Sequence, residues 1–439
     1  MVLRPVNIKT AFLNVPLDKE ICMCKPTLVG NGYWRLLKGL YGLKQAGWQW
    51  YLELDSCLGS IGFKQMESNW SVYQRAQGAE CSIITTSVDD MLIASSTTVE
   101  SDAVVSTLSL QFEITDNGEP NLHLGCSIKR DHTKKLIWLN QQSYTESILQ
   151  GFGYSACNSI TTPMDPGARL SPATPDDILK GKDFPYTTVV RKCMYLATCT
   201  QPDIAYTIWE LARFMASYGP AHIAAAKHLL HYLQGTTSHG ITLGGLETAQ
   251  PLFKALTDSD WGMGDSCKSV SGFLIMMGAL PLSWSSKQQA VIALSSCEAE
   301  YLATTHCAHD VLWFRNLFAK LGFPQDQPTT LFCDNQGTVA CTHDPHAHSK
   351  MKHISIREHF IQDCIIKHLI NVIHVSNKEN IADLLTKPLH HVLHAHWINM
   401  LWLDASQGGG VRMWLSILAD LICTNLVSET TYHCLHCTR

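Results

Sequence analysis

Two short segments in the second half of the chain each have the pattern of a β-strand that ends at an acidic residue. Residues 253–258 alternate as in a strand and end at Asp258, and residues 329–334 predict a second strand that ends at Asp334 before a helix. Each segment therefore places a carboxylate at a strand end. Because strands and helices alternate from residue 253 onward, an α/β domain is expected there.

A helix is predicted between these two strands, and one face of it carries an acid. Ser295 and Glu298 have the spacing of a capping box, which predicts that the helix begins there and runs to about Leu321. Apolar residues recur along it at steps of three or four, and the same step backward from Ala303 reaches Glu300. The carboxylate of Glu300 should therefore point toward the sheet, where a buried acid needs a partner.

A second capping-box spacing lies further along the chain. Ser376 and Glu379 predict a short helix that extends through Asp383 and stops before Pro388. If four acids met here, they would repel one another by about a few kcal/mol per pair and would need divalent cations between them. These acids are Asp258, Glu300, Asp334 and Asp383. The spacing alone leaves open that they only cap strands and helices and never meet.

The composition excludes a disordered chain but leaves the class of ligand open. The 439 residues are 46% hydrophobic, enough for several cores, and a net charge of −5 does not mark a nucleic-acid binder. Residues 1–75 carry nine Lys or Arg against five Asp or Glu, whereas residues 76–120 carry eight acidic residues and no basic one. This pattern indicates either a basic face beside an acidic pocket or chance unevenness along the chain.

No feature of the sequence indicates secretion or a membrane span. The 17 cysteines have no repeating spacing, and the N-terminal residues lack the pattern of a signal peptide. The apolar stretch 413–427 contains Asp420 and is too short to cross a bilayer. We therefore expect an intracellular protein, cytoplasmic or nuclear, with reduced thiols. Zinc binding by the Cys/His tail at 433–437 or by the histidines within 343–353 is disfavoured, because neither offers an obvious ligand set.

A series of motifs follows in order between residues 253 and 389. They are DSDWG from Asp258, KSVSGF from Lys268, SWSSKQ from Ser283, ALSSCEAEY from Ala293, CDNQ from Cys333, KHI from Lys352 and ADLLTKP from Ala382. This series resembles the ribonuclease H domain of copia-type retrotransposon polyproteins. The resemblance implies a mixed sheet flanked by helices, and Mg²⁺ or Mn²⁺ held by Asp258, Glu300, Asp334 and Asp383. Asp260 shares a strand face with Asp258, so alternation cannot choose between them, and the motif favours Asp258.

The upstream part of the chain is similar to the reverse transcriptase of the same elements. Its motifs are KTAFLN from Lys9, WRLLKGLYGLKQAG from Trp34, VDDMLI from Val88 and MYLATCTQPDIA from Met194. Residues 81–95 predict a hairpin with Asp89 and Asp90, the family's metal-binding pair, at its tip. Asn7 and Ser87 stand where the family has an aspartate and a tyrosine, and the sequence begins where the family's palm begins. Because a neutral amide at Asn7 removes an anionic metal ligand, we expect polymerase activity to be lost.

A nucleic-acid-binding face is predicted where basic and aromatic residues mix. Lys38, Lys44 and Gln45 are candidates for contacts with nucleic acid, because lysines suit phosphates and nearby rings such as Trp48 and Trp50 can stack on bases. The same rings could equally belong to an amphipathic helix that packs them into the core.

Residues 161–177 have loop composition, and residues 187–235 have a helical pattern. The expected fold is α/β and α+β, in four parts: a truncated reverse transcriptase palm and thumb (1–160), a linker and helical connection (161–245), a ribonuclease H-like mixed sheet with flanking helices (250–390) and an irregular tail (391–439).

The resemblance implies cleavage of the RNA strand of RNA–DNA hybrids, with the hybrid, an RNA template and DNA as partners. The alternative is a non-catalytic relic or a nucleic-acid-binding protein.

Overall fold

The computed structural model describes residues 1–77, 80–134, 136–181, 183–244, 253–262, 267–278, 280–343 and 355–401. These residues form two compact units. The first covers residues 1–124, and the second runs from residue 125 to residue 401 in the described part. Each unit has its own sheet and its own hydrophobic core.

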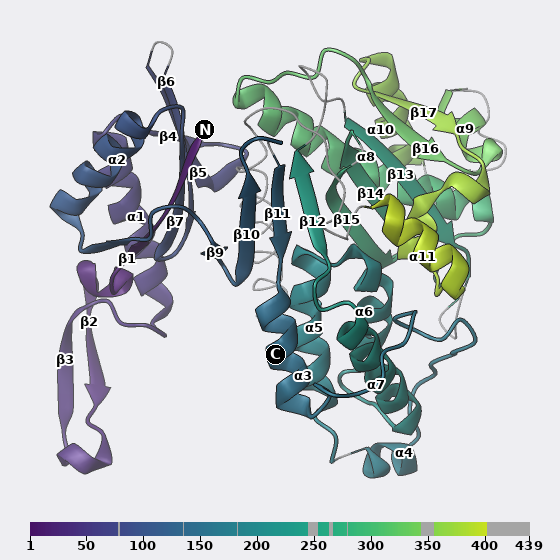
Figure 1. The fold of residues 1–439 in the computed structure, drawn as a ribbon, viewed down its shortest axis with the longest axis horizontal. Helices are drawn as coiled ribbons and strands as arrows, with labels where there is room; N and C mark the ends of the chain where they lie inside the picture. The colour runs from purple at the N-terminus through teal and green to yellow at the C-terminus, as the bar shows by residue number, and fades with distance from the viewer. Residues whose placement is uncertain are drawn as a thin grey trace. The chain divides into compact units, whose positions relative to one another are not determined.

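The first unit is built around a six-stranded sheet in the order β4-β5-β6-β7-β1-β8. Its strands are β1 (Val2–Ile8), β4 (Lys64–Met66), β5 (Asn69–Gln77), β6 (Glu80–Ser87), β7 (Asp90–Ser95) and β8 (Ile114–Asp116). Two helices pack against one face of this sheet (Figure 1), α1 (Lys44–Ser60) and α2 (Thr98–Gln111). The remaining elements are η1 (Ala11–Asn14), a hairpin of β2 (Pro16–Cys24) and β3 (Tyr33–Lys38), η2 (Thr27–Val29) and β9 (Leu122–His123).

The core of the first unit lies between the sheet and these two helices. Trp50 of α1 and Leu108 of α2 are buried together with Ile84 and Ile93 of the sheet. Burying one such side chain contributes roughly 1.5–3 kcal/mol. Trp50 therefore packs in the core, as the amphipathic-helix alternative predicted, whereas Trp48 of the same helix is 54% exposed.

The second unit begins with β10 (Cys126–Asp131), β11 (Leu136–Asn140) and α3 (Gln142–Phe152). Helices follow, in the order α4 (Pro175–Lys180), α5 (Tyr186–Cys199), η3 (Pro202–Ile204), α6 (Ala205–Ala212) and α7 (Pro220–Gly235). Strand β12 (Gly240–Gly244) then pairs antiparallel with β11. The later elements are β13 (Phe253–Asp260), β14 (Val270–Met277), β15 (Leu280–Gln288), α8 (Ser296–Lys320), β16 (Thr329–Cys333), α9 (Gln336–His343), α10 (Ser355–Ile366), β17 (Ile370–His374), η5 (Asn377–Glu379), η6 (Ile381–Leu385) and α11 (His391–Met400).

A five-stranded mixed sheet in the order β15-β14-β13-β16-β17 forms the later part of the second unit. Its central strand, β13, is antiparallel to β14 and parallel to β16, and β17 lies parallel beside β16. Helix α8 packs against β13 and β14. The predicted apolar stripe of α8 is buried at every position, namely Ala303, Cys307, Val311, Phe314, Phe318 and Leu321. The expected fold class, with a mixed sheet and flanking helices, is confirmed.

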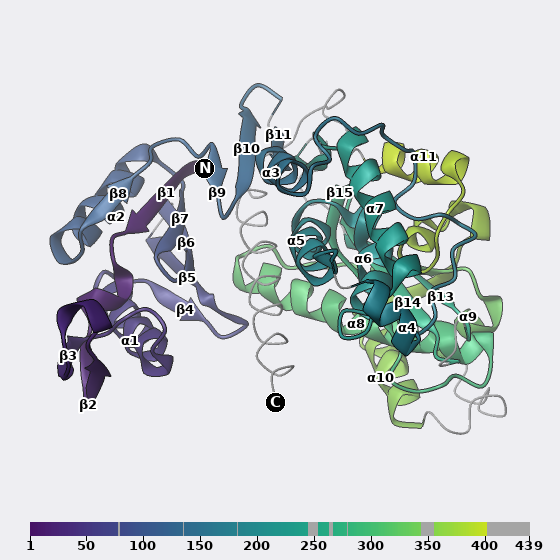
Figure 2. The same cartoon turned by 90° about the horizontal axis from the view of Figure 1, so that it is seen from below.

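Helices α3, α5, α6 and α7 form a second core within this unit (Figure 1, Figure 2). The indole Nε1 of Trp284, on β15, donates a hydrogen bond of 2.7 Å to the backbone carbonyl of Ala197. Ala197 lies in the last turn of α5, where carbonyl groups have no partner within the helix. Trp284 therefore caps α5 from the sheet and packs the helices against it.

The predicted start of α8 is confirmed, with one difference in the cap. The side chain of Ser295 accepts a hydrogen bond from the backbone N–H of Glu298, as expected. The carboxylate of Glu298 does not return the bond to Ser295. It accepts from the backbone N–H of Leu294 instead, over 2.8 Å.

The helix predicted from Ser376 through Asp383 is wrong. Two separate 3₁₀ turns, η5 and η6, occupy this segment and meet at Asn380. The side chain of Asn380 accepts a hydrogen bond from the backbone N–H of Ala382 and so begins η6. Ser376 precedes η5, but its side chain makes no capping bond to the backbone, and its hydroxyl donates to the carboxylate of Glu379.

The other predicted segments fall as follows. The loop from residue 161 continues to Thr174, where a capping box with Asp177 begins α4, and the helical pattern over 187–235 corresponds to α5, α6 and α7. Among the described residues, no helix has both the length and the apolar character needed to cross a bilayer. The described cysteines are free thiols. The histidines at 346, 348 and 353 and the Cys/His tail at 433–437 lie outside the described residues.

Candidate functional site

Asp258 lies at the centre of the mixed sheet. It is near the end of β13, opposite Gly272 of β14, and only 3% exposed. The hydroxyl of Thr386 donates a hydrogen bond to Oδ2 of Asp258. A methyl group on Gly272 would come within 2.6 Å of the side chain of Thr386 and 2.9 Å of Leu385. Glycine at this position therefore allows η6 and the residues after it to lie directly against the sheet.

Glu300 reaches the same region from the N-terminal end of α8 and is 5% exposed. Its Oε1 accepts hydrogen bonds from the backbone N–H and the hydroxyl of Ser259, over 2.9 and 3.0 Å. Burial, followed by the charges of Asp258 and Asp334, raises the pKa of Glu300 well above its ordinary value. The predicted inward orientation of Glu300 is confirmed.

Asp334 follows directly after β16 and is half-buried. The side-chain amide of Asn380 donates to Oδ2 of Asp334 over 3.2 Å and to the backbone carbonyl of Thr257 over 2.9 Å. Burial, and then the charge of Asp258, raises the pKa of Asp334. Asn380 therefore links the start of η6 to two strands and fixes the carboxylate of Asp334.

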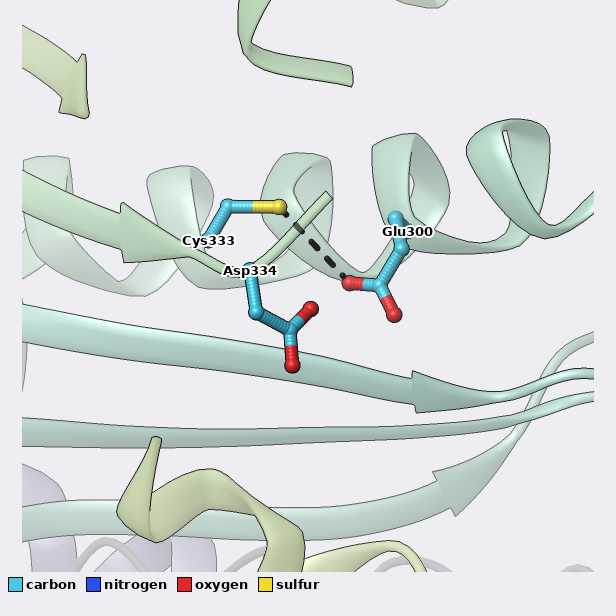
Figure 3. Close-up of side chains that lie close together, drawn as sticks. All are labelled: Glu300, Cys333 and Asp334. Carbon is cyan, nitrogen blue, oxygen red and sulfur yellow. Dashed lines mark hydrogen bonds between the residues drawn. The ribbon is translucent and has the colours of Figure 1, made fainter. Parts of the chain in front are cut away.

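Cys333, the last residue of β16, lies beside Glu300 of α8 (Figure 3). Its thiol donates a hydrogen bond of 3.8 Å to Oε2 of Glu300, and potential ligand atoms of Glu300, Cys333 and Asp334 lie within 4.8 Å of one another. Burial, and then the charge of Glu300, raises the pKa of Cys333. The thiol therefore stays protonated and acts as a donor to Glu300.

Asp383 lies on η6 and is 5% exposed. With Asp258, Glu300 and Asp334 it makes up the acidic group of the second unit. One oxygen each of Asp258, Asp334 and Asp383 lies within 4.8 Å of the others. Burial, and then the charge of Asp258, raises the pKa of Asp383 to about 7. The four carboxylates named from the sequence thus fall into two overlapping groups: Asp258, Asp334 and Asp383 in one, and Glu300 and Asp334, with Cys333, in the other.

Lys387 lies among these acids, although the sequence motifs gave it no role. Its Nζ is 2.7 Å from Oδ1 of Asp383 and 3.7 Å from Oδ2 of Asp258. Burial lowers the pKa of Lys387, but the charges of Asp258 and Asp383 outweigh burial and raise it. Lys387 and Thr386 both belong to the ADLLTKP motif, so the signal was present. Lys387 contacts Asp383 four residues away, but the contacts of Thr386 and Lys387 with Asp258 join segments far apart in the chain, which local spacing does not predict.

Asp260 is half-buried and, in the described part of the chain, belongs to neither group of potential metal ligands. Burial raises the pKa of Asp260 to about 6, with Lys387 opposing this rise and Asp258 adding to it. Of the two candidates on β13, the geometry therefore favours Asp258.

The first unit has an acidic turn of its own. Asp89 lies in the turn between β6 and β7 and Asp90 begins β7, so the predicted hairpin is confirmed. Asn7 of β1 pairs with Asp90 in the sheet, and its amide Nδ2 donates a hydrogen bond of 2.8 Å to Oδ1 of Asp90. Within the described residues, neither aspartate belongs to a group of three or more potential metal ligands. The side chain next to Asp90 on the neighbouring strand is therefore the neutral amide of Asn7.

The backbone before this aspartate pair has an uncommon conformation. Val88 has φ 58°, in the left-handed region that β-branched residues rarely adopt. The indole Nε1 of Trp50 donates a hydrogen bond of 2.7 Å to the backbone carbonyl of Val88. Ser87, in place of the family's tyrosine, ends β6 and pairs with Asp90.

The residues predicted to bind nucleic acid lie at the end of β3 and at the start of α1, which follows it in the chain. Lys38 ends β3, and Lys44 and Gln45 begin α1. Both lysines are exposed and Gln45 is half-buried. The exposed ring of Trp48 follows on α1, with its centroid 5.2 Å from that of Tyr51. Contact of these residues with nucleic acid stays a prediction.

Comparison with known proteins places the chain in a family. Residues 1–166 match the family model described as reverse transcriptase (RNA-dependent DNA polymerase). The chain is 34% identical over 393 residues to the retrovirus-related Pol polyprotein from transposon TNT 1-94 of Nicotiana tabacum, covering 87% of this chain and 29% of that protein. It is also 34% identical over 393 residues to the corresponding polyprotein from transposon RE1 of Arabidopsis thaliana, covering 88% of this chain and 26% of that protein.

These matches define a retroelement protein with a reverse transcriptase region. More closely, the chain belongs to the copia-type retrotransposon Pol polyproteins, as its motifs indicated. It spans less than a third of the length of the two relatives. A solved foamy viral protease-reverse transcriptase in complex with an RNA/DNA hybrid aligns with a TM-score of 0.47 and 11% identity, over 86% of this chain and 44% of that one.

Proposed function

We propose that the second unit cleaves the RNA strand of RNA–DNA hybrids with the help of Mg²⁺ or Mn²⁺. The observation that carries this proposal is the convergence of carboxylate oxygens from Asp258, Asp334 and Asp383 within 4.8 Å, with Glu300 joined to them through Asp334. Membership of a Pol polyprotein family supports a nucleic acid as the substrate.

The ligands in this group fit a hard divalent cation. Its four carboxylates offer oxygen atoms, which Mg²⁺ and Mn²⁺ prefer, and the protonated thiol of Cys333 is a hydrogen-bond donor rather than a competing ligand. Burial disfavours the charges of Glu300, Asp334 and Asp383, and a bound cation offsets that cost. Asp258, Glu300, Asp334 and Asp383 would hold the divalent cations, whose chemistry would be to activate a water and stabilise the departing oxygen of a phosphodiester.

The residues around the carboxylates hold them in position. Ser259 binds Glu300, Asn380 binds Asp334, and Thr386 binds Asp258. Because Glu300, Asp334 and Asp258 are already oriented by these hydrogen bonds, less reorganisation is needed when a phosphate group arrives.

The proposed substrate is recognised by its backbone rather than by its base sequence. A hybrid presents 2′-hydroxyl groups on one strand, and these distinguish it from double-stranded DNA. Lys38 and Lys44, which are exposed, are proposed contacts for phosphates of the hybrid, the RNA template or DNA. Binding that rests on such contacts weakens as salt rises, by about 0.9 log units per contact and per tenfold change in salt for a duplex.

Cleavage of a hybrid by the full chain tests this proposal. With a labelled RNA strand and Mg²⁺, we expect RNA fragments and no cleavage of double-stranded DNA. Asp334→Asn should lower the rate by about 100-fold or more. The matched control is Asp326→Asn, at an exposed position, which should keep the rate of the unchanged protein. An unchanged protein that is folded by circular dichroism but cuts no hybrid in Mg²⁺ or Mn²⁺ would contradict the proposal and favour the non-catalytic alternative.

We propose further that the first unit does not synthesise DNA. The hydrogen bond from Asn7 to Asp90 supports this, because an amide donor stands where the family has a third carboxylate. Asp89 and Asp90 alone offer a divalent cation fewer anionic ligands than the family's set.

A further inference from the structure

Lys387 is positioned as a cation for the acidic group of the second unit. Its ammonium is 2.7 Å from Asp383 and 3.7 Å from Asp258, two of the carboxylates with converging oxygens. Asp260 adds to the negative potential at Lys387. The backbone N–H of Lys387 also donates to the carbonyl of Asp383, over 3.3 Å, which fixes the start of the side chain beside the acids.

The side chain of Lys387 is anchored at its base but is not enclosed. It is 34% exposed, whereas the side chains of Asp258 and Asp383 are 4% and 6% exposed. A lysine stem has four rotatable carbon–carbon bonds, so the ammonium can move to solvent while the backbone stays in place. The carboxylates, in contrast, stay where hydrogen bonds and burial hold them.

We propose that Lys387 is a resident counter-ion that a divalent cation displaces. In the metal-free protein its ammonium lies between Asp258 and Asp383, and binding of the cation to the same carboxylates drives the ammonium outward. This role rests on the metal site of the proposed function. Lys387 is therefore a positioning residue that keeps the acids together before the metal arrives and lowers the affinity for that metal.

A neutral side chain of similar length separates this role from a purely structural one. Lys387→Met leaves the acids without a cation in EDTA, so the melting temperature of the full chain should fall by roughly 5 °C. Saturating Mn²⁺ supplies the missing charge, so most of this difference should disappear. Mn²⁺ binding, measured from the electron paramagnetic resonance signal of the free ion, should tighten about tenfold because no ammonium competes.

Three further proteins complete the experiment. Lys378→Met changes an exposed lysine on η5 and should leave both measurements unchanged. Lys387→Arg keeps the positive charge and should keep most of the stability in EDTA, and it also serves if Lys387→Met does not fold without metal. Asp383→Asn measures the Mn²⁺ that binds elsewhere on the chain.

The outcomes distinguish this inference from the proposed function. A deficit of Lys387→Met that is equally large in EDTA and in Mn²⁺, or an unchanged Mn²⁺ affinity, would overturn the counter-ion role while leaving the metal site intact. If the unchanged protein bound no more Mn²⁺ than Asp383→Asn, the metal site itself would be overturned, and the role of Lys387 with it.

Discussion

One side-chain amide lies against the acidic turn of the first unit. The Nδ2 of Asn7 donates a hydrogen bond to Asp90, whereas an aspartate at the same place would add negative charge and require a cation between the two side chains. The hydrogen bond satisfies Asp90 without metal. A single uncharged group thus stabilises the turn and removes a ligand from it.

Primer extension tests the consequence for DNA synthesis. With an RNA template, a DNA primer and Mg²⁺ or Mn²⁺, we expect no extension products from the full chain, because Asn7 leaves the aspartate pair without its third anionic ligand. Products that vanish in Asp89→Asn would show that the site works despite Asn7 and would refute the prediction.

A pH dependence follows from the acids of the second unit. In the metal-free protein, Asp383 holds its proton up to about pH 7, whereas in the unfolded chain its pKa returns to the ordinary range near 4. Between these values the folded state binds more protons, so the free energy of unfolding falls as pH rises. Glu300, whose pKa is also raised, acts in the same direction.

Melting curves in EDTA between about pH 5 and pH 8 measure this dependence. The melting temperature of the unchanged protein should decrease across this range, and Asp383→Asn, which cannot titrate at that position, should show a smaller decrease. Saturating Mn²⁺ should flatten the profile of the unchanged protein. A melting temperature that rises with pH in EDTA would contradict the assigned shifts.

At single positions, sequence reasoning identified acids better than their partners. Glu300 was placed toward the sheet because a helical period fixes the direction of a side chain, and the structure agrees. Asp258 and Asp260 share a strand face, so alternation could not distinguish them; the motif favoured Asp258, and η6 contacts Asp258 from elsewhere in the chain. The contacts of Asn380 with Asp334 and of Lys387 with Asp258 were missed because they depend on tertiary packing.

Among the elements, η6 depends on an unusual closeness to the sheet. It carries Asp383, is followed directly by Thr386 and Lys387, and packs where Gly272 of β14 has no side chain. The capping-box spacing at Ser376 predicted one helix here, but the side chain of Asn380 competes for the backbone and divides the segment into two turns. The spacing of Ser376 and Glu379 permits a capping box, but in the folded chain the side chain of Asn380 makes the capping bond instead.

Gly272→Ala tests how much the site depends on this closeness. The added methyl would lie 2.6 Å from Thr386, so η6 must move, and we expect a loss of roughly 1–3 kcal/mol in stability. Hybrid cleavage should fall more than stability suggests, because Asp383 moves with η6. Gly151→Ala, on α3 of the same unit with open space around it, is the control and should be neutral or slightly stabilising. Full activity in Gly272→Ala would show that η6 tolerates displacement.

For the molecule as a whole, the sequence predicted the fold class more reliably than the packing between its parts. Alternating patterns and ordered motifs indicated a mixed sheet with flanking helices, and that sheet is present. The hydrogen bond from Trp284 of β15 to Ala197 of α5 joins segments far apart in the chain, and no local pattern predicts it. Because the helices before residue 245 pack against the sheet, activity is best measured on the full chain rather than on residues 250–400.

The order of the strands also determines when the acidic group can exist during synthesis. β13 finds its antiparallel partner β14 after a short connection, but its parallel partner β16 begins only at Thr329, and η6 begins at Ile381. A chain emerging from the ribosome therefore presents Asp258 and Glu300 first, and Asp383 and Lys387 last. Pairing between segments this far apart in a chain is slow, and the four carboxylates cannot all come together before the segment that carries Asp383 has been made.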